Sequence, residues 1–65
     1  MTLEVMKTEE AAKYVRLGKA TLDRYRLIGG GPRFAKLGGA VRYRKVDLDD
    51  WIESRVISST SEAAA

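Results

Sequence analysis

The apolar positions near the start of the chain repeat at helical spacing. Ala11, Ala12 and Val15 fall at positions i, i+1 and i+4, which puts them on one narrow stripe of a helix. Thr8 precedes this stripe, and a threonine hydroxyl can accept a hydrogen bond from a free backbone N–H at a helix start. The pattern therefore predicts a first helix from Thr8 to Val15 with Thr8 as its N-cap, after a loosely alternating, extended lead-in over residues 1–7.

A second helix is predicted over residues 19–27, directly after a three-residue turn that ends in Gly18. Gly18 can serve both as a turn residue and as a weak N-cap. At 100° per residue, Leu22 and Tyr25 lie within about 60° of each other and form the edge that we expect to be buried. The side of the helix that points away from this edge carries Ala20 and Arg24. Two short helices joined by such a turn are typical of a helix-turn-helix.

A β-hairpin is predicted next, because Gly38-Gly39 separates two short extended runs, residues 34–37 and 41–44. Side chains alternate between the two faces of a strand. The second run therefore has an apolar face, with Val41 and Tyr43, and a cationic face, with Arg42 and Arg44. We expect the apolar face to pack on the helices and the cationic face to be presented to a partner.

The last periodic segment, residues 47–55, predicts a third helix with acidic side chains in its first turn, where they complement the helix dipole. Its apolar stripe consists of Leu48, Trp51 and Ile52, and we expect Trp51 to anchor the core rather than to offer a stacking platform. The predicted fold class is mainly α with a small β-hairpin: a winged helix-turn-helix of three short helices and a two-stranded wing. This domain spans residues 1–56, and residues 57–65 form a flexible C-terminal tail.

Composition limits the functions open to the chain. With 65 residues and neither Cys nor His, it has room for one small core and no means to form a disulfide, a zinc finger or a Cys or His nucleophile pair. The acids at 47, 49 and 50 are explained by a helix start, so we expect no enzyme, metal site, cofactor or small-molecule substrate. No apolar run approaches the roughly 18 residues that span a membrane. A reducing, cytoplasmic setting is the default expectation.

The charge distribution points to a polyanionic partner. Residues 13–45 hold ten basic side chains against one acid, Asp23, although the net charge of the whole chain is only +3. Positive charges clustered in this way repel one another unless an anionic partner neutralises them, and double-stranded DNA is the usual partner of such a basic cluster. A solvated basic surface without a partner is the alternative.

The order of the motifs then resembles a known family. The segments are Thr8-Glu9-Glu10-Ala11-Ala12-Lys13-Tyr14-Val15, Lys19-Ala20-Thr21-Leu22, Gly30-Gly31-Pro32-Arg33-Phe34, Lys36-Leu37-Gly38, Val41-Arg42-Tyr43-Arg44 and Asp47-Leu48-Asp49-Asp50-Trp51-Ile52. In this order, across residues 3–55, they resemble the excisionase-like branch of the MerR-type winged helix-turn-helix superfamily. This branch includes phage excisionases, recombination directionality factors and AlpA-like regulators.

The resemblance implies that the second helix lies in the major groove and that the wing lies beside the DNA backbone or in the minor groove. On the recognition helix, the resemblance leads us to expect Lys19, Ala20, Thr21 and Arg24 as DNA-binding residues. Arg26 is added because of its position on the same helix, as a brace of the fold or a contact to the DNA backbone. Those expected on the wing are Lys36, Arg42 and Arg44. Arg24 suits bidentate reading of guanine; an ion pair with Asp23 is its alternative. Gly39 and Ala40 occupy the wing tip where the family often has Arg, which favours phosphate contact there.

Three functions follow as hypotheses. The first is an excisionase that loads on attachment-site DNA and directs a tyrosine recombinase (the integrase) toward excision, with head-to-tail self-association of copies on the DNA. The absence of an effector domain or a long dimerising helix favours it over the second, a small AlpA-like transcriptional regulator of a mobile element. The third is an antitoxin-like protein-interaction module, against which we count the absence of a large exposed apolar stripe.

Overall fold

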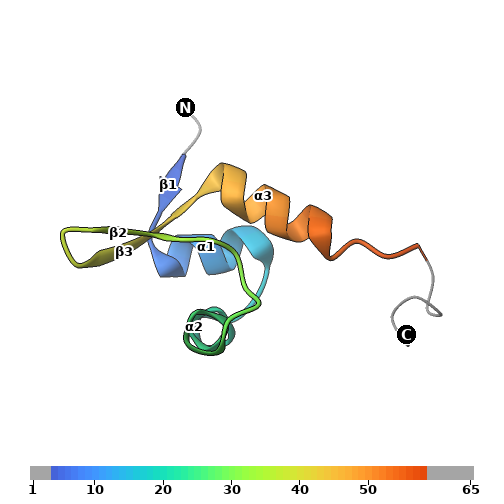
Figure 1. Cartoon of the computed structure of the whole chain (residues 1–65), viewed down its shortest axis with the longest axis horizontal. Helices are drawn as coiled ribbons and strands as arrows, with labels where there is room; N and C mark the ends of the chain where they lie inside the picture. Colours follow the sequence, from blue (N-terminus) through green and yellow to red (C-terminus); the bar gives the residue numbers. More distant parts are fainter. Residues whose placement is uncertain (1–3, 59–65) are drawn as a thin grey trace.

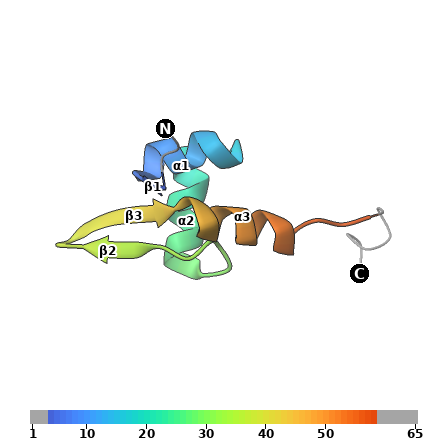
Figure 2. The same ribbon diagram turned by 90° about the horizontal axis from the view of Figure 1, so that it is seen from above.

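The computed structural model describes residues 4–58, which contain three helices and three strands. Their order is β1 (Val5–Met6), α1 (Thr8–Val15), α2 (Lys19–Ile28), β2 (Ala35–Leu37), β3 (Ala40–Arg44) and α3 (Lys45–Ser54). The β2–β3 hairpin projects from one end of the molecule, and α3 points toward the other (Figure 1). Seen from above, α2 runs across the direction of the hairpin and of α3 (Figure 2). The prediction of a mainly α, winged helix-turn-helix fold is confirmed.

The sheet has one strand more than the predicted wing. Its order is β1-β3-β2, with both pairings antiparallel. Met6 pairs with Tyr43 and Val5 with Arg44, so the expected lead-in supplies a short edge strand. A two-residue strand carries too little alternation to be recognised from sequence, and its pairing with β3 is what defines it.

The core lies where the helices meet the middle strand. Its buried members are Met6, Ala11, Ala12, Leu22, Tyr43 and Leu48, one or two from each of β1, α1, α2, β3 and α3. The two alanines of α1 are small, which lets the other elements approach closely. Complete burial of a leucine side chain contributes about 1.5–3 kcal/mol, so Leu22 alone provides much of what holds α2 against the body. Tyr25, expected beside Leu22 in the buried edge, is only half-buried.

The beginning and end of α1 differ in detail from the prediction. Thr8 is the first helical residue and Lys7 is the N-cap, so the assignment of Thr8 as the cap is wrong. The carboxylate of Glu10 accepts a hydrogen bond from the backbone N–H of Lys7 at 2.9 Å and satisfies this end of the helix instead. At the other end Arg16 adopts the left-handed conformation with φ of 61°, whereas Gly18 is extended and caps α2 as predicted.

Helix α3 begins at Lys45, two residues before the predicted start at Asp47. It follows β3 without a break, and the Lys45 backbone N–H donates to the Glu4 carbonyl at 2.8 Å beside the β1–β3 pair. Arg44 is therefore the N-cap residue. Of the three aspartates expected in the first turn, only Asp47 lies there.

Trp51 does not anchor the core, because it is only half-buried and lies outside the buried cluster. Its indole Nε1 donates to the Gly30 carbonyl at 2.9 Å, and its ring makes a T-shaped contact with the Tyr25 ring at a centroid distance of 5.4 Å. Arg55 stacks over the indole and donates to the same carbonyl. Trp51 thus fastens α3 to the loop between α2 and β2. Of the predicted flexible tail, residues 57 and 58 are described and exposed, and residues 59–65 lie outside the described part.

Candidate nucleic-acid interface

The outer side of α2 exposes the side chains that the sequence assigned to base contact. Ala20, Thr21 and Arg24 are exposed, and Leu22 on the opposite side is fully buried. Asp23 does not pair with Arg24: it accepts from Lys19 and from Arg26, each at 3.0 Å. The Arg24 side chain makes no hydrogen bond or ion pair with any residue from 4 to 58, so its guanidinium is available to a ligand.

Lys19, expected at a phosphate, stands at the first position of α2 and is paired with Asp23 one turn later. The hydrogen bond from Lys19 lowers the pKa of the Asp23 carboxyl, and Arg26 adds to the effect. The Lys19 side chain is more than half exposed. Exposed ion pairs contribute little to stability, so Lys19 can exchange Asp23 for a phosphate at small cost.

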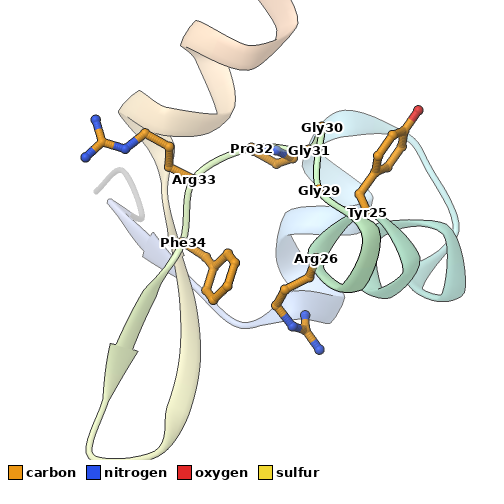
Figure 3. A pocket seen from close by; sticks show the side chains of 8 residues that line it. All are labelled: Tyr25, Arg26, Gly29, Gly30, Gly31, Pro32, Arg33 and Phe34. Carbon is orange, nitrogen blue, oxygen red and sulfur yellow. The ribbon is translucent and has the colours of Figure 1, made fainter.

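Arg26 points toward the wing and away from the exposed face of α2. Its guanidinium donates to the Tyr43 hydroxyl at 3.2 Å, pairs with Asp23 and lies 5.9 Å from the centre of the Phe34 ring. Figure 3 shows Arg26 and Phe34 leaning into the space between α2 and the strands, while Tyr25 points outward from the same helix. The hydrogen bond to Tyr43 raises the pKa of Arg26. This geometry fits a role of Arg26 as a brace between α2 and β3 rather than as a contact to the DNA backbone.

The wing divides its predicted contacts between two faces. Residues directly opposite each other in an antiparallel pair share a face. Lys36 is opposite Val41 and therefore lies on the core-facing side, which is also the side that carries α2. Arg42 is opposite Ala35 and lies on the other face, partly buried, where its side chain donates to the Val41 carbonyl at 2.8 Å. The register therefore puts Lys36, and not Arg42, on the side of the sheet that carries α2.

Arg44 is engaged within the fold. Its Nε and Nη2 donate to both carboxylate oxygens of Asp47 at 2.7 and 2.9 Å. Asp47 is only 6% exposed, and the guanidinium holds the pKa of its carboxyl below the ordinary value. The cationic face that we expected to be presented to a partner is therefore partly neutralised within the chain, because α3 begins early enough to bring Asp47 under Arg44.

Two apolar residues on α2 were missed. Leu27 is 84% exposed and Ile28 is 72% exposed, so the expectation of no exposed apolar stripe does not hold at this end of the helix. Helical spacing could have found them, since positions 27 and 28 each lie within about 60° of the exposed position 24. Ile28 borders a hollow of about 300 Å³ that Thr21, Arg24 and Tyr25 also line.

The arrangement is that of a helix with one exposed face, preceded by a short helix and a turn and followed by a projecting hairpin. A family model described as "Helix-turn-helix domain" matches residues 5–56. The chain belongs to this helix-turn-helix family. A search of the curated proteins returned no match.

Membership in the helix-turn-helix family suggests sequence-specific binding of double-stranded DNA, and domains of this family are typically non-enzymatic. Within residues 4–58 no group of three or more Asp or Glu side chains is placed to hold a metal ion. In the same part of the chain no helix combines the length and apolar character that a bilayer crossing needs.

Proposed function

We propose that this helix-turn-helix domain is an excisionase, a recombination directionality factor that loads on attachment-site DNA and directs a tyrosine recombinase toward excision. The observation that carries the DNA-binding part is the exposed face of α2, on which Arg24 is uncommitted while the neighbouring Asp23 is held by two other cations. The excisionase part rests on the ordered motifs of residues 3–55.

In the proposed complex α2 enters the major groove and the wing flanks it. An α-helix with its side chains is about 10–12 Å across, which suits a groove about 12 Å wide. Arg24 then reads guanine O6 and N7, while Lys19 and Lys36 contact phosphates on the two sides of the groove. Arg26 holds α2 and β3 at a fixed angle, so that both sets of contacts can form together.

Single modules bury only about 600–1,000 Å² on DNA, which limits their affinity. We therefore propose that copies load side by side on direct repeats, where attachment to the same duplex raises their effective concentration for one another. A site with several repeats should bind more tightly per repeat than a site with one. Equal affinity per repeat would remove self-association from the proposal.

Substitution of Arg24 tests sequence reading. Arg24→Ala should weaken binding to a selected site by about 1–3 kcal/mol and binding to random duplex very little. Affinity of the unaltered protein should also fall with salt, at a slope of about −3 to −4.5 for three to five phosphate contacts. A slope near zero would contradict DNA binding and favour the interaction-module hypothesis. Equal losses on selected and random DNA would contradict the role of Arg24.

Footprinting on the DNA of the parent element tests the excisionase role. Protection of an array near an attachment site, together with stimulation of excision by the cognate integrase, is the expected result. Protection confined to a promoter would overturn this role and indicate the AlpA-like transcriptional regulator.

A further inference from the structure

The hollow on the outer side of α2 is built from four residues at positions i, i+3, i+4 and i+7: Thr21, Arg24, Tyr25 and Ile28. Thr21 offers a methyl group, Tyr25 a ring and Ile28 a branched aliphatic chain. Arg24 is the one charged residue of the four. The hollow therefore combines an apolar lining with a single cationic donor on its rim.

The floor of this hollow is held in place by the rest of the fold. The Tyr25 ring makes a T-shaped contact with the Trp51 ring, and Trp51 is fixed by its hydrogen bond to the Gly30 carbonyl. On its other side the backbone at Gly31 approaches so closely that a Cβ there would lie 2.6 Å from the Tyr25 Cβ. Tyr25 is thus clamped between α3 and the glycine loop, and the hollow does not depend on a ligand to form.

We propose that this hollow receives the 5-methyl group of a thymine next to a guanine read by Arg24, so that the domain selects sites with adjacent T and G. The inference rests on the proposed DNA binding and names part of the sequence that is read. The major groove displays an apolar methyl on thymine and two acceptors on guanine N7 and O6, and neighbouring bases are only about 3.4 Å apart. This combination matches an apolar hollow with a guanidinium at its rim.

Replacement of thymine by deoxyuridine tests the proposal, because uracil lacks the methyl group and keeps every hydrogen-bonding atom. In a site selected from random duplexes, uracil at the thymine beside the essential guanine should weaken binding about fourfold, the effect of exposing one methyl-sized group. Ile28→Ser should abolish this difference between thymine and uracil. Leu27→Ser is the matched control: Leu27 is even more exposed than Ile28 but does not line the hollow, so this variant should keep the difference.

The outcomes separate the two proposals. If no position of a tightly bound site distinguishes thymine from uracil, or if the Ile28→Ser variant still does, the hollow is not a methyl site, while DNA binding stands. If the unaltered protein selects no sequence at all, the proposed function itself fails. If it dimerises without DNA and Ile28→Ser is monomeric by sedimentation, the hollow is a contact between copies, which also overturns the methyl site.

Discussion

Removing one oxygen atom from the Tyr43 side chain would test the brace between the recognition helix and the wing. In Tyr43→Phe the ring keeps its packing against Met6 and Leu48 in the core, but Arg26 loses the hydroxyl acceptor at 3.2 Å. Hydrogen bonds to charged groups contribute about 1.5–3 kcal/mol. Arg26 retains Asp23 and is 24% exposed, so water replaces part of the loss. We therefore expect a destabilisation of about 1–1.5 kcal/mol.

For a domain of this size each 1 kcal/mol lowers the midpoint of thermal unfolding by about 4–8 °C, so Tyr43→Phe should lower it by about 5–10 °C in a circular dichroism melt. Tyr14→Phe is the matched control. It also removes a tyrosine hydroxyl, one that donates to Asp49 on an exposed surface between α1 and α3, and exposed pairs are weak. Its midpoint should fall by no more than about 2 °C. Equal shifts in the two variants would refute the claim that the Arg26–Tyr43 contact is structurally special.

Three further outcomes follow from the structure. Lys36→Ala should weaken DNA binding more than Arg42→Ala, because Lys36 lies on the face of the sheet that carries α2. Fluorescence anisotropy at two salt concentrations measures both affinities, and the reverse order would contradict the assigned register. Arg44 lowers the pKa of Asp47, so this pair stabilises the fold above the ordinary pKa of 3.8, and its contribution is lost as pH falls through the lowered value. In thermal melts from pH 7 to pH 2, Asp47→Asn should therefore lose less stability than the unaltered protein, and identical profiles would count against the pair. Arg16→Gly should raise stability by about 0.5–1 kcal/mol by relieving the left-handed conformation, and an unchanged or lower melting midpoint would argue against strain there.

Most of the helix positions could be predicted because they depend on local spacing. The stripe of Ala11, Ala12 and Val15 and the burial of Leu22 follow from periodicity, which acts within a few residues. The start of α3 could not be predicted in this way. It is set by the hydrogen bond from Lys45 to Glu4, a contact between residues 41 positions apart in the sequence that leaves no local pattern.

The candidate site was predicted in kind but not residue by residue. The basic character of the chain identifies a nucleic-acid surface, yet charge alone does not say whether a given arginine meets a ligand or a carboxylate. Arg24 is uncommitted, while Arg44 holds Asp47 and Arg26 holds Tyr43. Each pairing depends on a neighbour brought close by the tertiary fold. The sequence also assigned Trp51 to the core because of its size, whereas its indole N–H is bonded to a loop carbonyl at the surface.

The pairing of β1 with β3 also has a consequence for the order in which the domain folds. Val5 and Arg44 are neighbours in the sheet although 38 residues separate them along the chain. The entropic cost of closing a loop grows with its length, and the contacts of the two-residue strand β1 are few to offset that cost. The hairpin and the α1–α2 pair close far shorter loops and should form first, with β1 docking after the rate-limiting step. Substitutions at Val5 should therefore accelerate unfolding and leave the refolding rate almost unchanged in stopped-flow measurements.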